Sequence, residues 1–430
     1  MLPFFIPETY LKPWETTALA APTAYDNDTY ALFEGLVRSY VTAQTSIQET
    51  PNPSGSLWTG GLSEPKFTVA GEPFTGSWGR PQRDGPALRA LALIPYAHYL
   101  LDRDFPADKD YVTQHLYNPT VFRKGGSVIK NDLEEVANAW WLSSFDLWEE
   151  VNAFHLWTDA VSRRAMQAGA ALANRLGDTL AADYYSMQAK AITIRLASYQ
   201  RSDGIWNESI PTPEGRDGLD AGTILAVVHA GGNDTDAIEL AATSASSLST
   251  LRAYILSFEK LYKVNTGKWV DGWLVGRYNS DVYDGVGFTG GNPWYITTFS
   301  VAHVLYAAQA GFARAGSIDF GGAAAAFWAD LGFNASSWRR IGDDTFSAAL
   351  RRLGDVADAF VAAAARTVKA EGAMTEQIGR DDGVPRGARN LTWSYASLLE
   401  MKRARDSAKA AVGAATTFAA SVGRRFIRDA

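Results

Sequence analysis

The sequence predicts an all-α fold in which many helices form a toroid and long loops gather at one end as a cleft. Apolar residues recur at steps of three and four over most of the chain, whereas strand-like alternation is scarce and short. Long segments rich in Gly, Pro and aromatic residues lie between the helical ones, and loops of this length are usually functional. The predicted loops cover residues 50–85, 145–157, 267–291 and 372–388.

Each helix is predicted from its own apolar stripe. In residues 158–176 the stripe is continuous, Thr158 is placed to cap the helix and Gly177 to end it. Asn131 followed three positions later by Glu134 has the pattern of a capping box, so we expect another helix to begin there. The remaining helices are expected at residues 29–47, 86–102, 180–200, 235–261, 292–312, 345–368 and 391–425.

The helical pattern predicts a single domain. No Ser/Thr-rich or Pro-rich linker interrupts it, so we expect residues 29–430 to form one helical-toroid domain with a C-terminal helical tail. Residues 1–28 contain several prolines and little periodicity, and they are expected to stand apart from the fold.

Composition excludes several classes of protein. The 430 residues include 40 Lys+Arg and 47 Asp+Glu, and this net charge of −7 argues against a nucleic-acid partner. The absence of Cys excludes disulfides, Cys-ligated zinc, iron–sulfur clusters and thiol catalysis, and no pair among the five His has a metal-ligand spacing. We therefore expect no metal and no cofactor. The apolar run at residues 88–101 is broken by Arg89, Pro95 and His98, so no membrane span is expected.

One glycine motif suggests a nucleotide site but lacks the right context. Residues 285–290 read G-x-G-x-x-G, and a helix is expected to follow at Pro293. No strand pattern precedes the motif, and no acidic residue occurs between Asp284 and Asp319 to bind a ribose. A flexible turn is the favoured interpretation.

Carboxylates in aromatic loops indicate glycosidic-bond hydrolysis. Asp146, Glu149 and Glu150 lie in one loop beside Trp148, and Glu376 lies in a later one. Hydrolysis of a glycosidic bond needs one carboxyl held protonated and a second one ionised. Burial beside a Trp would raise the pKa of a Glu in the way that an acid catalyst needs. A solvated pair at a helix end remains the alternative for Glu149 and Glu150.

Six segments, in order along the chain, extend this interpretation. Together they resemble the fungal glucoamylases of glycoside hydrolase family 15, over about residues 29–400. They are Gly76-Ser-Trp-Gly-Arg-Pro-Gln-Arg-Asp-Gly-Pro-Ala-Leu-Arg89, Asp146-Leu-Trp-Glu-Glu-Val-Asn152, Val275-Gly-Arg-Tyr278, Gly291-Asn-Pro-Trp294, Met374-Thr-Glu-Gln377 and Arg389-Asn-Leu-Thr-Trp-Ser-Tyr395.

The resemblance implies an (α/α)6 barrel that releases β-glucose from non-reducing ends of starch and malto-oligosaccharides, with inversion at α-1,4 and, more slowly, α-1,6 bonds. It implies that Glu149 is the general acid and Glu376 the general base, with carboxyls ~6.5–9.5 Å apart. It implies substrate binding by a further set: Lys66, Trp78, Asp146, Trp148, Glu150, Arg277 and Trp294.

Purely structural roles remain as alternatives for some of these residues. Core packing is the alternative for Trp294 and Trp393. For the stretch from Arg83 to Pro86 we favour a helix start and a salt bridge over catalysis. The enzyme is expected to be a monomer.

The N-terminus departs from the family pattern. Family members carry a first helix and a Tyr-x-Trp-x-Arg-Asp segment that holds the terminal glucose, and nothing in residues 1–27 matches it. We therefore expect a barrel without its first helix and an impaired enzyme; a carbohydrate-binding paralogue with little or no activity is the alternative. No starch-binding domain is expected.

Localisation is expected from the resemblance. It implies secretion, although Met1–Pro7 lacks the basic and apolar regions of a signal peptide. Five Asn-x-Ser/Thr sequons, at Asn27, Asn207, Asn233, Asn334 and Asn390, are consistent with secretion.

Overall fold

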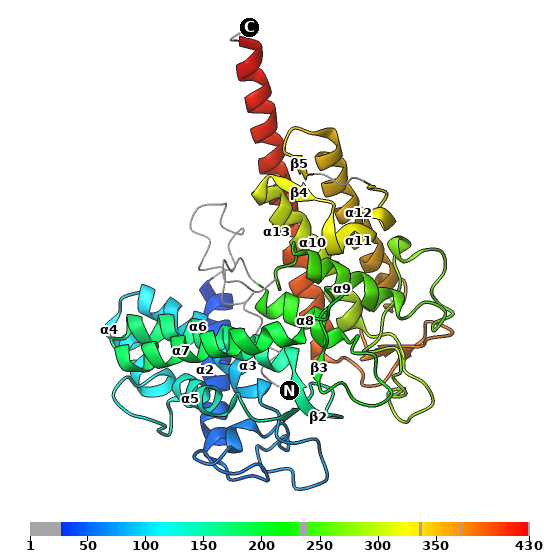
Figure 1. The fold of residues 1–430 in the computed structure, drawn as a ribbon. Helices are drawn as coiled ribbons and strands as arrows, with labels where there is room; N and C mark the ends of the chain where they lie inside the picture. The colour runs from blue at the N-terminus through cyan, green and yellow to red at the C-terminus, as the bar shows by residue number, and fades with distance from the viewer. Residues whose placement is uncertain (1–26, 232–239, 335–337, 370, 429–430) are drawn as a thin grey trace. The chain divides into compact units, whose positions relative to one another are not determined.

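The computed structural model describes residues 27–231, 240–334, 338–369 and 371–428, and its contacts divide the chain into two compact units (Figure 1). Unit 1 is Met1–Ala197 and unit 2 is Ser198–Ala430. The segment that was expected to stand apart, residues 1–28, lies outside the described residues except for Asn27 and Asp28, which begin the first described helix. The expected absence of a first helix therefore stays a prediction.

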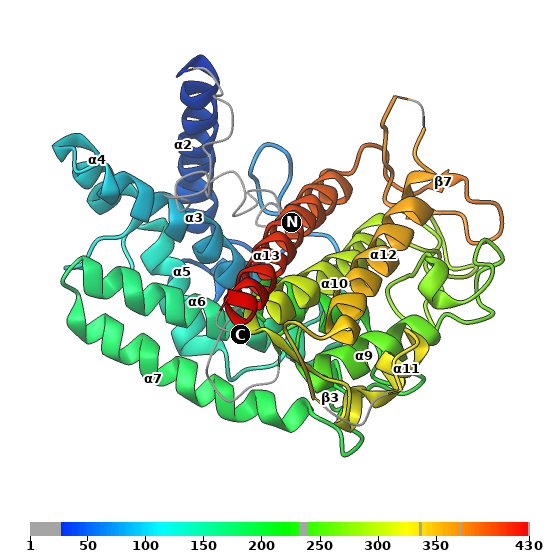
Figure 2. The ribbon, with the colours of Figure 1, turned by 90° about the horizontal axis from the view of Figure 1, so that it is seen from above.

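Unit 1 is built from helices joined by long irregular loops. Helix α3 packs against α5 and α6, and α6 packs along α7 (Figure 2). A short antiparallel pair, β1 with β2, precedes α6 and aligns Phe145 with Asn152. The elements are α2 (Asn27–Glu49), η3 (Gly61–Ser63), α3 (Asp84–Asp102), α4 (Pro106–Tyr111), η4 (Val112–Leu116), α5 (Val128–Ala139), β1 (Ser144–Phe145), β2 (Asn152–His155), α6 (Leu156–Arg175), α7 (Thr179–Leu196) and η5 (Ala197–Tyr199), which crosses the unit boundary.

The join between α6 and α7 follows from its sequence. Gly177 has φ +77°, the left-handed conformation that commonly ends a helix, and the Asp178 amide donates to Ala173 O at 2.9 Å. The Asp178 carboxylate then accepts from the Ala181 amide and caps α7. The predicted start of α6 was wrong, because the helix begins at Leu156 and Thr158 lies inside it.

The predicted capping box at Asn131 is also wrong. Helix α5 begins at Val128, so Asn131 lies in its first turn and does not cap it. Its buried side chain bonds instead to the preceding loop: Lys124 N donates to Oδ1 at 3.0 Å, and Nδ2 donates to Lys124 O at 2.8 Å. The residue is polar because it anchors a loop.

Unit 2 is organised around α10, which packs against α8, α12 and α13 (Figure 1). Two short antiparallel pairs, β4 with β5 and β6 with β7, lie in its loops. The elements are β3 (Ser209–Ile210), α8 (Ala221–Ala230), α9 (Ala245–Leu256), η6 (Trp269–Asp271), α10 (Tyr295–Ala315), β4 (Ser317–Asp319), η7 (Gly322–Ala324), α11 (Ala325–Asp330), β5 (Trp338–Arg340), α12 (Asp344–Ala365), β6 (Gln377–Ile378), β7 (Pro385–Arg386) and α13 (Thr392–Arg428).

Two helices of unit 2 differ from expectation. Helix α8 was not predicted, because Ala221–Ala230 is buried almost throughout and shows no polar stripe. The helix expected over 235–261 is shorter: α9 begins after a Ser244 cap and ends at Leu256, and residues 232–239 lie outside the described part.

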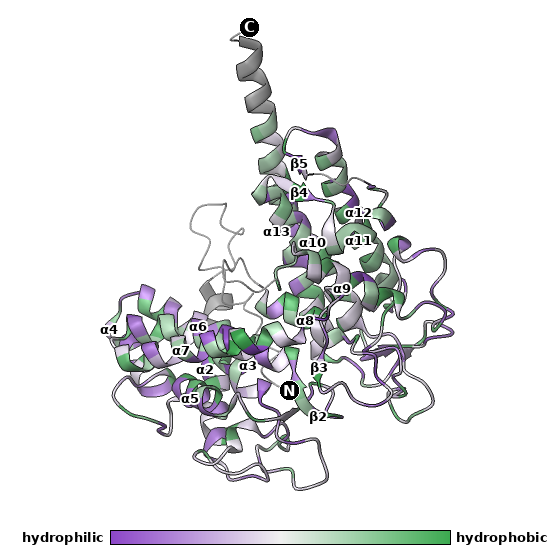
Figure 3. Ribbon diagram, viewed as in Figure 1, coloured by the Kyte–Doolittle hydropathy of each residue, from purple (hydrophilic) through white to green (hydrophobic). Residues whose placement is uncertain are grey.

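The described residues confirm the predicted class: helices dominate, and strands are few and short. Each helix carries both hydrophobic and hydrophilic residues, as expected for elements with one packed face (Figure 3). No helix in the described ranges is both long and apolar enough to span a membrane.

Candidate active site

Glu149 lies in a tight turn between β1 and β2. The Asp146 carboxylate closes this turn, because its Oδ1 accepts from the Glu150 amide at 2.7 Å and from the Val151 amide at 3.0 Å. Glu149 itself has φ +68°, a conformation that non-glycine residues rarely adopt. Asp146, predicted to bind substrate, is thus buried and bonded to the turn that positions Glu149, while Glu150 is exposed.

A second loop lies directly against this turn. The Phe145 amide donates to Pro81 O at 2.9 Å, and the Arg83 amide donates to Ser144 Oγ at 3.0 Å. A Cβ at Gly79 would lie 2.4 Å from the Glu149 carbonyl oxygen, so only glycine permits this approach. The two motifs that carry Trp78 and Glu149 are therefore joined by backbone contact.

A cavity of about 660 Å³ brings together three predicted site residues: Lys66, Trp78 and Glu149. Lys66 Nζ lies 3.2 Å from the centroid of the Trp78 ring and 4.4 Å from that of Phe74. The indole N–H of Trp78 is buried, and it interacts with the Glu149 carboxyl and favours its charged form.

The environment of Glu149 suits an acid. Burial raises the pKa of its carboxyl, and the Trp78 and Gln82 side chains and the Lys66 charge offset this only in part. The sequence predicted that burial would raise this pKa, and the rise is confirmed; Trp148 itself is buried within the turn. The proton is thus retained to higher pH than on a solvated Glu.

Charged residues that were not predicted as site residues line the same cavity. The Arg89 guanidinium forms two hydrogen bonds with Asp132, and Arg80 Nε contacts both oxygens of Glu64 at 3.1 Å. Asp84 begins α3, as expected, and accepts from Trp157 Nε1 at 2.9 Å. The sequence showed these charges, but only the fold brings Glu64, Asp84 and Arg89 to one wall.

Arg277 forms a buried pair in unit 2. Its Nε donates to Asp281 Oδ2 at 2.8 Å and its Nη2 to Oδ1 at 2.7 Å. The guanidinium also lies 5.3 Å from the Tyr283 ring and 5.4 Å from the Trp294 ring. Arg277 and Trp294 are thus neighbours, and Trp294 is only 4% exposed.

Glu376 is held by a hydrogen-bonded chain. Gln377 Nε2 donates to Glu376 Oε2 at 3.2 Å, and Asn292 Nδ2 donates to Gln377 Oε1 at 2.9 Å. Gly387 has φ +70°, and a Cβ there would lie 2.6 Å from Glu376 Oε2. The carboxyl therefore packs against bare backbone.

Two opposing influences act on the charge of Glu376. Burial raises the pKa of its carboxyl, and the Asp281 charge raises it further. Gln377, the Arg277 charge and the Tyr283 hydroxyl lower it only in part, so the pKa of Glu376 stays above its ordinary value. Tyr283 was not predicted as a site residue.

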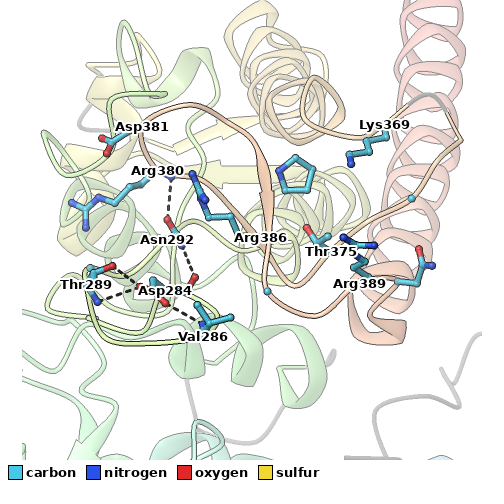
Figure 4. A pocket seen from close by; sticks show the side chains of 15 residues that line it. Asp284, Val286, Thr289, Asn292, Lys369, Thr375, Arg380, Asp381, Arg386 and Arg389 are labelled. Atoms are coloured by element: carbon cyan, nitrogen blue, oxygen red, sulfur yellow. Dashed lines mark hydrogen bonds between the residues drawn. The ribbon is translucent and has the colours of Figure 1, made fainter.

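A second cavity, of about 800 Å³, adjoins the Glu376 loop (Figure 4). Thr375 and Gly387, which flank Glu376, are in its wall together with Lys369, Arg386 and Arg389. In Figure 4 these three cations and Thr375 border one hollow.

The G-x-G-x-x-G segment forms part of the same wall as a closed turn. The Asp284 carboxylate accepts from the Val286 and Gly287 amides, at 3.0 and 2.6 Å, and from the Thr289 hydroxyl. These bonds lower the pKa of Asp284 to about 2. The segment thus encloses its own carboxylate, as a turn does.

The predicted residues therefore form two groups. Lys66, Trp78 and Glu149 meet in unit 1, and Arg277, Trp294 and Glu376 meet in unit 2. Trp393 is half-buried at the start of α13. Glu149 and Glu376 lie in different units, so the predicted separation of their carboxyls stays a prediction.

The family follows from comparison with known proteins. The model of "Glycosyl hydrolases family 15" matches residues 15–403. The chain belongs to this family. Glucoamylase-1 of Schizophyllum commune is 37% identical over 93% of the chain and 67% of its own length. The probable glucoamylase of Schizosaccharomyces pombe is 34% identical over 94% of the chain and 84% of its own length.

Solved structures of family 15 confirm the fold. The glucoamylase from Hypocrea jecorina superimposes with a TM-score of 0.78 at 37% identity, covering 86% of the chain. That from Hormoconis resinae gives 0.80 at 33% identity, covering 94% of the chain. These neighbours have the (α/α)6 fold, as predicted. The chain spans 59% and 64% of the two solved chains.

Proposed function

We propose that the chain releases β-D-glucose from the non-reducing ends of starch and malto-oligosaccharides, by hydrolysing α-1,4 bonds and, more slowly, α-1,6 bonds. Membership of family 15 and relatives named glucoamylases support this activity. The observation that carries it is the Glu149 carboxyl, whose pKa burial raises in a cavity that also holds Trp78 and Lys66.

Glu149 acts as general acid in this proposal. Its proton passes to the glycosidic oxygen as the bond from that oxygen to C1 breaks. Burial keeps the proton in place before reaction, and the left-handed backbone fixes where the carboxyl starts from. The Trp78 ring offers apolar area for a sugar ring, and its indole N–H favours the carboxylate that Glu149 becomes once its proton has left.

Glu376 acts as general base. It takes a proton from a water whose oxygen attacks C1 from the opposite face, so that the product is the β-anomer. Burial raises the pKa of Glu376, and the Arg277 charge and the Tyr283 hydroxyl offset this rise only in part, so the carboxyl serves as a base at a pH above the raised pKa. After each turnover Glu149 is ionised and Glu376 is protonated, and exchange with solvent restores both.

A direct test follows the anomer and the rate together. The parent chain, Glu149→Gln and Glu376→Gln are incubated with maltoheptaose, and glucose is followed by proton NMR. We expect β-glucose to appear first with the parent and both variants to be at least about 10³-fold slower. Initial α-glucose would refute inversion. Equal rates for the parent and both variants would refute the assignment and support the non-catalytic paralogue.

We also infer that the protein acts outside the cell, as a monomer. Asn334 and Asn390, both in sequons, are exposed, whereas the Asn207 amide donates to Ser209 O and Thr212 Oγ1. Secretion from a fungal host should therefore leave glycan on Asn334 and Asn390 but not on Asn207. Glycopeptide mass spectrometry and the mass in solution test both inferences.

A further inference from the structure

Two aromatic rings lie side by side on the surface of unit 1. Trp58, in the turn that follows α2, is 59% exposed, and Phe122, in the loop before α5, is 55% exposed. Their ring centroids are 6.5 Å apart and their planes meet at 39°. Large aromatic side chains placed together in water forgo the free energy of burial, and such exposed patches commonly mark ligand sites.

A buried arginine joins the two rings. Arg123, next to Phe122, is 6% exposed, and its Nη1 donates to the carbonyl oxygen of Leu57, next to Trp58, at 2.6 Å. Its Nη2 donates to Glu135 at 2.8 Å. The hydrogen bond thus connects the residues adjacent to the two rings, so that the rings stay together without packing into a core.

Each loop is also rigid on its own. In the first, the Trp58 amide donates to Ser56 Oγ at 3.3 Å, and the Ser56 amide donates to Thr59 Oγ1 at 3.0 Å. In the second, the Asn131 side chain bonds both backbone groups of Lys124. A ligand that stacks on these rings therefore orders little of the protein, which favours binding.

The surroundings favour a sugar over a protein partner. The exposed apolar surface here is small, with Val121 (37% exposed) beside the pair, and the exposed residues Thr59 and Thr120 lie next to it, their hydroxyls bonded to Ser56 and Asn118. A glucose ring has apolar C–H faces and hydroxyl edges, and both find counterparts here. Neither ring is among the residues that line the 660 Å³ cavity.

We propose that Trp58 and Phe122 form a second α-glucan-binding site, on which two successive glucose rings of one starch chain stack. The proposal rests on the proposed function only for its class of ligand. Such a site would hold the enzyme on insoluble starch and raise the local concentration of chain ends.

The test uses β-cyclodextrin and starch granules as probes. β-Cyclodextrin is an α-1,4 glucan without a non-reducing end, so its binding does not report on a site that takes chain ends. We expect the double variant Trp58→Ala/Phe122→Ala to bind β-cyclodextrin at least about tenfold more weakly by calorimetry, and to adsorb less to granules. Hydrolysis of maltose should be unchanged, which also shows that the variant is folded.

Trp141 provides the matched control. It is 58% exposed, its indole donates to Asn138 O, and the described residues show no aromatic ring against it. Trp141→Ala should bind as the parent does, and Trp58→Phe, which keeps a ring, should retain most of the affinity.

Three results would overturn the proposal. They are unchanged binding in the double variant, an equal loss in Trp141→Ala, or adsorption to cellulose as strong as to starch. Glu376→Gln should still adsorb to granules while releasing no glucose. An inactive parent would therefore refute the proposed function and leave the adsorption result standing.

Discussion

The Lys66 ammonium lies 3.2 Å from the centroid of the Trp78 ring, in the cavity that also holds the Glu149 carboxyl. A cation over an aromatic face is held by the electrons of the ring. The same charge lowers the pKa of Glu149. Lys66 therefore both contacts the Trp78 ring and influences the protonation of the proposed acid, Glu149.

Replacing this charge should move one limb of the pH profile. In Lys66→Met the pKa of Glu149 rises, since a stabiliser of the carboxylate is gone, so the acid stays protonated to higher pH. We expect the alkaline limb of kcat on maltoheptaose to shift upward while the acidic limb stays. Lys190→Met, which removes an exposed charge from α7, is the control, and a downward shift in Lys66→Met would contradict the assignment.

A methyl group at position 387 should displace the proposed base. In Gly387→Ala the new Cβ meets Glu376 Oε2 at 2.6 Å, so the carboxyl must move. A misplacement of this size lowers turnover by about 10²-fold. Gly372→Ala has a similar φ, +74°, with nothing within 4 Å of the new Cβ, so it shares the backbone strain alone. Equal loss of kcat in both variants would show that strain, not displacement, is responsible.

Two Arg–Asp pairs of the same spacing allow burial to be tested. Arg277–Asp281 and Arg386–Asp382 are both four residues apart with 2.7 Å contacts, but only the first is buried. Asp281→Asn should lower the free energy of unfolding by about 3 kcal/mol, because it leaves a buried guanidinium without its counter-charge. Asp382→Asn should change it by less than about 1 kcal/mol. Urea titration of both variants measures the difference, and similar values would contradict it.

His303 should make the fold sensitive to acid. Burial, and then the Arg403 charge, lowers the pKa of this side chain to about 4, from 6.5. Below pH 6.5 the His303 side chain binds a proton in the unfolded chain but stays neutral in the folded one. The free energy of unfolding therefore falls as the pH drops toward 4. The effect is about 3 kcal/mol at most. His303→Leu should lose less stability between pH 7 and pH 4 than the parent does, and identical losses would show that the imidazole is accessible to protons.

The helices were predicted where one face is polar. Residues 345–368 and 391–425 correspond to α12 and α13, because both helices keep a polar stripe that makes the period visible. Ala221–Ala230 was missed because a helix buried on all sides has no such stripe. The prediction for Asn131 was wrong because an Asn that anchors a neighbouring loop cannot be told from an Asn that caps a helix by residue type alone.

The site was predicted to the level of motifs, and its neighbours were not. Glu149, Trp78 and Glu376 stand in segments that resemble the family's motifs, and their proposed roles come from that resemblance. The roles of Gly79 and Gly387 arise from close approaches to the two glutamates across the fold. Tyr283 was missed for the same reason, since its effect on Glu376 depends on how two loops of unit 2 meet.

The turn closed by Asp146 determines the smallest segment of this enzyme that can be redesigned as a unit. Glu149 stands in a left-handed backbone that the Asp146 carboxylate maintains through the amides of Glu150 and Val151. A library that randomises position 149 alone places every new side chain on a left-handed backbone that few residues tolerate. A library that randomises position 146 alone removes the hydrogen bonds that hold that backbone in place. Positions 146 to 151 should therefore be exchanged together, and recombination breakpoints should be placed outside this segment.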